Sequence, residues 1–512
     1  MIGSKDITTS VNKYQRYLFF LMVLLFPFTH FPLSLPFAGS TPYTLCIIIG
    51  YAFFAYEIFV KNVRLDRLEK FGFIFLIISI GWMGITGVFG VLNYQYYEQI
   101  NLVQMDKFKI FFDNVSIIYP LNELKSIKIW QCYKEIQQSI FNVIYTYLVS
   151  LWIYHLYRDN WRLGFLHLRR SIVVLCSCLF IYSLFEINYL VGGNVGQNIL
   201  AHINPIYMKI ADVHGWWPPL FWEGQVRSLF AEPSFLGIFS ALAMPVLSSF
   251  YFIKRLTIKS IPGILLHMGM AFLIVLSKAR TGTVLFIGEI GLLIIWVTLF
   301  NRKLWKRILL LLFCTGLIFF IGIKFISQFS ANSSVNHQDV NMAVEGYVKQ
   351  NLTSVVGNKR SNNARKANVF ATVRIGMEHP LFGIGHGLKD MYLNNKLEPD
   401  DFQNHEVANW SAYMYEKGPL KSAYPTLNQL AGVFAEQGFL GVIIFLFPIC
   451  YIFIKLWKRK NLLCDYSIAC ISVALIGLIV AFFSNTAMIY YYVAIGFALV
   501  AVNCNQGGKQ IK

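Results

Sequence analysis

The sequence predicts an all-α polytopic membrane protein, with about twelve transmembrane helices and one large extracytoplasmic loop between the ninth and tenth. Of its 512 residues, 56% are hydrophobic and only 14% are charged, whereas soluble domains carry about a quarter charged residues. Apolar runs of about 18 to 25 residues recur from end to end, each long enough to cross a bilayer as a helix. Basic residues gather in alternate short loops, as in membrane proteins with a defined topology.

Twelve apolar runs carry this prediction. The first begins among basic residues like a signal peptide, but no small-residue cleavage site follows it, so we expect an uncleaved span. The fourth and seventh are the shortest or most interrupted. In chain order the predicted spans are 17–36, 41–60, 71–92, 139–157, 171–191, 230–253, 260–277, 281–300, 308–328, 438–456, 464–484 and 486–503.

The loop charges predict the orientation. Short cytoplasmic loops collect Lys and Arg, and 24 of the 44 basic residues fall in seven short segments that alternate with the other loops. Both termini are therefore predicted to be cytoplasmic. The seven segments are 1–16, 61–70, 158–170, 254–259, 302–307, 455–460 and 509–512.

The same orientation places four segments outside, at 93–138, 192–229, 278–280 and 329–437. The expected organisation is nine spans with their outer loops within 1–328, an extracytoplasmic loop domain at 329–437, and three spans with a cytoplasmic tail at 438–512. The loop domain is polar, and its stretch 364–378 is predicted to be helical.

We find no sequence pattern that indicates a cofactor or a metal site. Eight of the nine cysteines lie in or beside apolar spans, and they provide neither a disulfide framework nor metal-ligand spacing. The sequence GIGHG at 383–387 lacks the preceding strand of a nucleotide-binding loop. A net charge of +18 fits the lipid bilayer and acidic partners, and we expect no nucleic acid partner.

The stretch EGQVRSLFAEPSFLGIFSALAMPVL, residues 223–247, places charge at the entrance of an apolar helix. Arg227 and Glu232 precede the apolar run, and Pro233 suits a first helical turn, where its missing N–H costs nothing. The free N–H groups of such a helix start can bind an anion. Alternatively, Arg227 reaches lipid headgroups and Glu232 caps the helix.

A second charged pair, Lys278 and Arg280, lies in LSKARTGTVL, residues 276–285, where two spans meet almost without a loop. The predicted topology places both on the outer side, where cations are few. Two cations at a tight hairpin are costly unless an anion or a carboxylate meets them. Simple anchoring to headgroups is the alternative.

A third candidate is RIGMEHPLFGIGHGLKD, residues 374–390, in the large outer segment. Pro380 and three glycines predict a tight turn after a helix. His386 lies in that turn and Arg374 precedes it by a helical stretch. A lone surface histidine is usually only solvated, which is the alternative here.

Taken together, these stretches predict an arginine-rich pocket that faces outward at the membrane surface. Arginine binds phosphate through two parallel N–H donors. A lipid-linked diphosphate lies at that depth, so we expect a phosphorylated lipid substrate at the start of the helix that follows Glu232.

Four motifs then occur in a fixed order: Arg227 followed by EPSFLG, SKARTG at a hairpin, HPLFGIGHG, and LNQLAGVFAEQGFLG at 427–441. This ordered set resembles the O-antigen polymerase (Wzy-type) and O-antigen ligase superfamily. The resemblance extends over roughly residues 220 to 456, with the large outer loop between the motifs. The last motif contains Asn428, Glu436, Gly438 and Gly441.

The resemblance implies a GT-C-like membrane glycosyltransferase that uses undecaprenyl-diphosphate-linked oligosaccharides. The essential arginines of the superfamily carry over onto Arg227 and Arg280, which would hold the diphosphate. Glu232 is the available carboxylate for a general base, with His386 as the second candidate, and the scheme requires no metal or cofactor. Further candidates for substrate binding are Lys278, Arg374 and Asn428.

Ligases of the superfamily typically carry a histidine directly before the asparagine of the last motif, where this chain has Leu427. The resemblance therefore favours a polymerase of O-antigen or capsular polysaccharide. It would move a growing glycan from undecaprenyl diphosphate onto a lipid-linked repeat unit, at the outer face of the bacterial cytoplasmic (inner) membrane. A polysaccharide chain-length regulator is a candidate partner.

Other function classes stay open. A ligase that transfers glycan to lipid A core or protein uses the same donor and differs only in its acceptor. A flippase or other exporter would place charged groups at the bilayer midplane and show repeated halves, whereas the spans here are apolar and one outer segment is uniquely large. An interaction protein without chemistry is the least favoured class.

Overall fold

The computed structural model describes residues 4–34, 39–100, 106–118, 122–209, 224–253, 256–332, 360–418, 420 and 423–503. Every regular element within these ranges is a helix, so the predicted all-α class of a polytopic membrane protein is confirmed. Part of the large loop, 333–359, lies outside the described residues. So do four basic residues used to predict the topology, namely Lys254, Arg255, Lys509 and Lys512.

Nine helical segments of the described chain are long and apolar enough to cross a membrane, the pair α5–α6 counting as one. They are α3 (Arg67–Leu92), α5 (Glu123–Ile144) with α6 (Tyr147–Tyr157), α7 (Trp161–Leu190), α9 (Pro233–Ser248), α10 (Ile261–Leu276), α11 (Arg280–Phe300), α12 (Trp305–Asn332), α17 (Gln429–Lys458) and α18 (Tyr466–Ala481). Three further helices are α1 (Ser4–Leu24), α2 (Tyr43–Phe59) and α19 (Ile489–Asn503). Each of the twelve predicted runs overlaps one of these helices, and that all twelve cross the membrane stays a prediction.

Two predicted spans differ from the helices found there. The run 17–36 corresponds to α1, which begins earlier and ends at Leu24, because Pro27 lacks a backbone donor and disfavours helical geometry at the residue before it. The run 139–157 covers the end of α5 and all of α6, with a break at Thr146 between them. Helix α5 already begins at Glu123, inside the segment predicted to be an outer loop, because it packs along α3.

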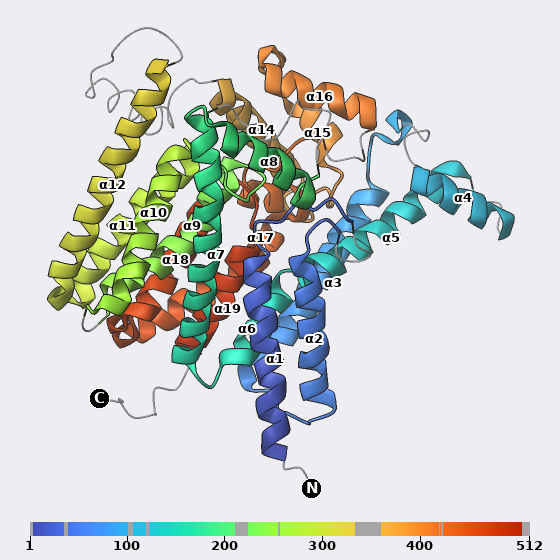
Figure 1. Cartoon of the computed structure of the whole chain (residues 1–512). Helices are drawn as coiled ribbons and strands as arrows, with labels where there is room; N and C mark the ends of the chain where they lie inside the picture. Colours follow the sequence, from blue (N-terminus) through green and yellow to red (C-terminus); the bar gives the residue numbers. More distant parts are fainter. Residues whose placement is uncertain are drawn as a thin grey trace.

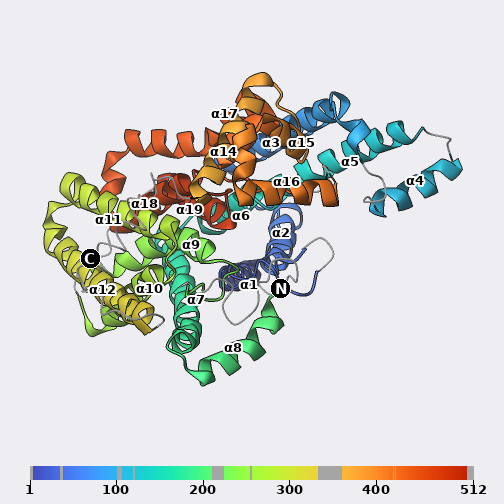
Figure 2. The same ribbon diagram turned by 90° about the horizontal axis from the view of Figure 1, so that it is seen from above.

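The helices outside the bundle gather at one end of the molecule. Figure 1 shows α8 (Asn194–Tyr207), α14 (Arg360–Glu378), α15 (Lys389–Lys396) and α16 (His405–Lys417) at the end opposite to both chain termini. We call this the loop end. Helix α14 confirms the helix predicted at 364–378. Seen from above, α4 (Asp106–Ile118) lies beside α5 and projects from the body (Figure 2).

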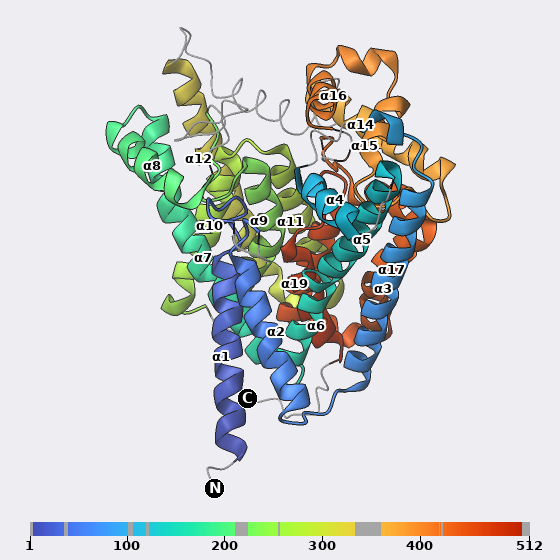
Figure 3. The same ribbon diagram turned by 90° about the vertical axis from the view of Figure 1, so that its right-hand side faces the viewer.

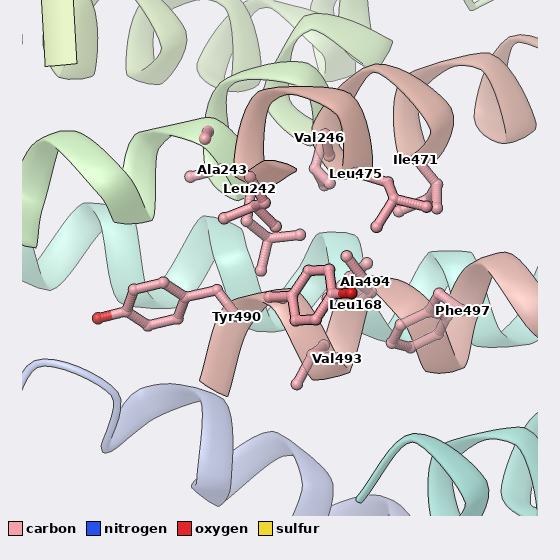
Figure 4. Packing of buried hydrophobic residues seen from close by; sticks show 14 of the residues in the cluster. Leu168, Leu242, Ala243, Val246, Ile471, Leu475, Tyr490, Val493, Ala494 and Phe497 are labelled. Atoms are coloured by element: carbon pink, nitrogen blue, oxygen red, sulfur yellow. The ribbon is translucent and has the colours of Figure 1, made fainter. Parts of the chain in front are cut away.

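Helix α9 lies at the centre of the bundle, with 83% of its most apolar stretch buried, the largest share among the nine candidate spans. Its apolar side chains pack against α18, α19 and α7, as Figure 4 shows for Leu242, Val246, Leu475, Val493 and Leu168. The start of α9, where Glu232 precedes Pro233, is therefore surrounded by the other helices of the bundle.

The helices of the large outer segment have a small hydrophobic core of their own. Side chains from α14, α15 and α16 contribute to it, together with Val91 at the end of α3, Tyr94 just after it and Ala435 of α17. Figure 3 shows these three helices above the ends of α3 and α17. The segment is thus seated on two helices of the bundle.

The predicted orientation can be tested by cysteine labelling at two exposed positions, Asp400 near the loop end and Lys303 between α11 and α12. In a cysteine-free background, Asp400→Cys should react with a membrane-impermeant thiol reagent on intact cells, or on spheroplasts where an outer membrane intervenes. Lys303→Cys should react only after permeabilisation. Labelling of position 303 in sealed cells would contradict the assignment of the loop end to the outside.

Candidate functional site

Helices α9 and α11 approach each other unusually closely at their starts. A Cβ atom added to Gly237 would lie 2.8 Å from the Cα of Gly282, and the reverse contact is also 2.8 Å. This approach requires glycine on both helices. It brings the free N–H groups of two helix N-termini together, and such groups attract anions.

Arg227, in the segment before α9, is fully buried. Its Nη1 donates to the carbonyl oxygen of Phe230 at 2.7 Å, to that of Ser228 at 3.3 Å and to the Tyr207 hydroxyl at 3.2 Å. The Ser228 N–H donates to Glu186 of α7 at 2.8 Å. Arg227 thus fixes the segment that leads into α9, and its predicted contact with a diphosphate stays a prediction.

Glu232 occupies the position directly before α9. Its backbone is extended and its side chain forms no capping bond to the helix. The Ser234 hydroxyl donates to its Oε2 at 3.0 Å. The carboxylate is half-buried and also lies close enough to His30 and Arg365 to influence both of them electrostatically.

Arg280 begins α11 and contacts the large outer segment. Its Nη1 donates to Asn362 Oδ1 of α14 at 2.8 Å. One turn further along α14, Arg365 donates to the carbonyl oxygen of Ser484 at 2.9 Å, in the connection between α18 and α19. Helix α14 therefore bridges the start of α11 to the end of α18.

Several charged side chains lie close enough to Arg365 to shift the pKa of its guanidinium group. Burial lowers the pKa of its guanidinium, and the like charge of Arg280 lowers it further, while Glu406 and Glu232 act in the opposite direction. Lys278, two residues before Arg280, has a left-handed backbone with φ of +49°, and burial lowers the pKa of its ammonium group. We call Lys278, Arg280 and Arg365 the cationic cluster. It is an environment that favours an anion.

Asn428 and its neighbour organise the start of α17. The Asn428 side chain accepts the N–H of Ala431 at 3.0 Å, the usual N-cap interaction. Gln429 accepts the N–H of Ala487 at 2.8 Å, and its own N–H donates to the carbonyl oxygen of Phe482 at 2.9 Å. The structure thus shows Asn428 as a helix cap, and its neighbour Gln429 binds the same connection between α18 and α19 that Arg365 contacts.

The glycine-rich turn docks onto a break within α17. Gly438 interrupts this helix with φ of 69° and ψ of −171°, a conformation that only glycine adopts without strain. The indole of Trp82 on α3 donates to the Gln437 carbonyl oxygen at 3.1 Å. Three backbone bonds join turn and break: Ile384 N–H to Ala435 O (2.9 Å), Gly385 N–H to Glu436 O (3.0 Å) and Phe439 N–H to Pro380 O (2.8 Å).

His386 projects from this turn onto two acidic side chains. Its Nδ1 lies 2.7 Å from Glu436 Oε2, and its backbone N–H donates to Glu135 of α5 at 3.2 Å. The Glu436 carboxylate raises the pKa of His386 to about 9, with a smaller contribution from Glu135 and against the effect of burial. His386 is therefore an imidazolium near pH 7, and in that form it cannot accept a proton.

Arg374 lies on an exposed face of α14. It pairs with Glu398 at 2.5 Å and donates to the Lys396 carbonyl oxygen at 3.0 Å. Its side chain is 48% exposed, so this ion pair is worth little. Arg374 thus takes part in a surface contact, nine residues along α14 from Arg365, which meets Ser484, and twelve from Asn362, which meets Arg280.

Sequence reasoning missed three residues that the structure places with the candidates. Arg365 stands in a polar stretch without any local signal, and its role depends on the path of α14. Glu436 gave a signal, since it is a carboxylate in a mainly apolar run, and it pairs with His386. Glu135 reaches the same histidine from α5, more than two hundred residues away in the chain.

These features define a polytopic, all-helical membrane protein with a cationic site where several helices begin. Residues 265–446 match the family model described as O-Antigen ligase. The match confirms the resemblance to the O-antigen polymerase and ligase superfamily, and it covers Arg280, Arg365, His386 and Glu436 but not Arg227 or Glu232. It supports a bacterial membrane enzyme of O-antigen processing. No curated protein matches the chain.

Replacing Gly438 tests the docking of the turn. In Gly438→Ala the new Cβ would lie 2.2 Å from the Leu381 carbonyl oxygen, a backbone atom, in addition to the strained φ. We expect a loss of about 1–3 kcal/mol and a lower melting temperature in detergent. Gly316→Ala is the matched control, because a Cβ there meets nothing within 4 Å and alanine favours a helix. Equal melting temperatures for the two variants would contradict the docking.

The histidine pair predicts a pH dependence. The raised pKa of His386, about 9 against an ordinary 6.5, means that its stabilisation is complete below about pH 6.5 and is lost as the pH rises through about 9. Between pH 6.5 and 9.5 the melting temperature of the wild type should fall more than that of His386→Gln. The effect is modest, because the imidazole is 44% exposed and solvent screens the pair. Parallel curves would show that the pair does not titrate in this window.

Proposed function

We propose that this protein is a polysaccharide polymerase for O-antigen or capsule. It transfers a growing glycan from undecaprenyl diphosphate onto a lipid-linked repeat unit at the outer face of the cytoplasmic membrane. The observation that carries the proposal is the cationic cluster, Lys278, Arg280 and Arg365, at the loop end beside the joined starts of α9 and α11.

The diphosphate of the donor is the anion that this cluster would bind. Two guanidinium groups offer paired N–H donors to phosphate oxygens, and the two helix N-termini add their dipoles. Fixed positive groups at the leaving diphosphate stabilise the charge that develops as the glycosidic C–O bond breaks. Arg227, buried behind the cluster, keeps the segment before α9 in place and remains a candidate for direct contact after local rearrangement.

The transfer step needs a proton acceptor. A hydroxyl oxygen of the acceptor sugar attacks the anomeric carbon, the bond from that carbon to the diphosphate oxygen breaks, and undecaprenyl diphosphate leaves with the electron pair. Glu232 is the proposed general base for the hydroxyl proton, because its carboxylate is half-buried and lies near Arg365, which is also the neighbour of Arg280. His386, positively charged through Glu436, would instead help to hold the turn on α17.

A polymerase is favoured over a ligase by Leu427, which stands where ligases of the superfamily typically carry histidine. The charged His386 does not replace that base. Transfer of the glycan to another acceptor is the alternative function, and a glycan gel separates the two. Loss of a polymerase leaves single repeat units at the surface, whereas loss of a ligase removes surface attachment altogether.

Lysine substitutions test the diphosphate site. Arg280→Lys and Arg365→Lys keep the charge but lose the paired donors, which should cost about 2–4 kcal/mol, or roughly 30- to 1,000-fold in rate. In a strain without the native gene, both variants should reach the membrane at normal levels and leave single-repeat glycans on the gel. Glu232→Gln should be similarly impaired if Glu232 is the base.

Arg302→Lys is the matched control. Arg302 is exposed between α11 and α12, where its Nε donates to the Thr298 carbonyl oxygen, and its replacement should leave the polymer unchanged. Normal polymer from both Arg280→Lys and Arg365→Lys would refute the diphosphate site. Complete loss of surface attachment, with long chains still made inside, would favour the ligase.

A further inference from the structure

The loop end contains a cavity that has no part in the proposed transfer step. Its volume is about 680 Å³, and it lies between α14 and the short helix η8 (Pro399–Gln403) with the start of α16. This volume falls within the range of about 300–1,000 Å³ typical of ligand sites. We call it the α14 groove.

Helix α14 connects the groove to the cationic cluster. Its residues at positions 363, 366, 367, 370 and 374 line the groove, a spacing of three and four that places them along one stripe of the helix. Asn362, which accepts a hydrogen bond from Arg280, lies at the edge of this stripe, whereas Arg365, which contacts Ser484, lies on the opposite side of the helix. From Asn362 to Phe370 the helix rises about 12 Å, at about 1.5 Å per residue. An extended ligand bound at Arg280 could therefore pass Asn362 and enter the groove.

The walls of the groove combine an apolar face with polar groups. The ring of Phe370 is 61% exposed and presents a flat surface of the kind on which the C–H face of a sugar ring packs. Asn363, Gln403 and Asn404 add amide groups, which can both donate to and accept from hydroxyl groups. Ala367 is nearly buried in the groove lining, so its small side chain leaves space for a ligand.

The charged side chains that line the groove limit which kinds of sugar can bind there. Three carboxylates, Glu398, Asp400 and Asp401, line it together with the cations Lys366 and Arg374, and Arg374 is already paired with Glu398. The three carboxylates exceed the two cations by one, so acidic sugars would be disfavoured, since like charges across an interface repel. Hydroxyl and ammonium groups would find acceptors there.

We infer that the α14 groove is a glycan-binding subsite that holds neutral or amino-sugar residues of the saccharide whose diphosphate end lies at the cationic cluster. This inference rests on the proposed function for the identity of the saccharide. The groove retains the glycan several sugars away from the reacting bond. Binding energy gained there positions the diphosphate end without contributing to the chemical step itself.

Photo-crosslinking tests the subsite in living cells. Phe370→p-benzoylphenylalanine should, after irradiation, give a glycan-bearing adduct that migrates more slowly than the protein, and the adduct should be absent in a strain that cannot assemble the lipid-linked repeat unit. Met377→p-benzoylphenylalanine is the control on the same helix, with the native side chain 69% exposed outside the groove. No adduct at position 370, or equal adducts at 370 and 377, would overturn the subsite.

Kinetics with purified lipid-linked repeat unit provide a second test. Phe370→Ala, an exposed position where folding is not at risk, should raise KM about 3- to 10-fold, the loss of one aromatic contact, and leave kcat near that of the wild type. Met377→Ala should change neither constant. An unchanged KM in Phe370→Ala would count against the groove.

The two proposals can fail separately. If Arg280→Lys and Arg365→Lys polymerise normally while the position 370 adduct forms, the diphosphate site is refuted and the glycan subsite stands. If those lysine variants make only single repeats and the adduct is absent, the subsite is refuted and the proposed function stands.

Discussion

The arrangement of this molecule depends on the need of every backbone N–H and C=O group in hydrocarbon to find a partner within the protein. Nine helical segments of the described chain meet this need along their own length. Irregular backbone collects at the loop end, where it can be solvated, or it docks onto another backbone. The break in α17 at Gly438 is of the second kind, because the glycine-rich turn and Trp82 bond the groups around it.

Close packing of two helix backbones also assembles the candidate site. Gly237 and Gly282 let α9 and α11 touch at their starts, so that two helix N-termini and the charged residues around them share one place. Helix α14 crosses this place and contributes Arg365. Charge that would be costly inside the bundle is thereby gathered at its end, where the proposed diphosphate would compensate it.

The charged candidates fall into distinct environments with distinct tasks. Arg227 is enclosed by carbonyl oxygens and tyrosine, as suits a residue that fixes a chain segment. His386 and Glu436 form an ion pair that holds the turn, and the charge of that histidine removes it as a base at neutral pH. Arg280, Arg365 and Glu232 lie where the two helices begin, and the α14 groove lies further along α14. A site for a long, lipid-linked saccharide needs these parts to be separate, because the ligand is itself extended.

The sequence by itself determined the membrane class, the twelve apolar runs, the helix at 364–378 and the motif order, because hydrophobicity and local propensity act over neighbouring residues. It also singled out Arg280 and Glu232, since charge next to an apolar helix is locally visible. Only the tertiary structure decided which residues meet. Arg365 joins Arg280 through the path of α14, Glu135 reaches His386 across more than two hundred residues, and the burial of Arg227 follows from the packing of α7 and α8 around it. These outcomes depend on long-range contacts between helices, which no local pattern of residues specifies.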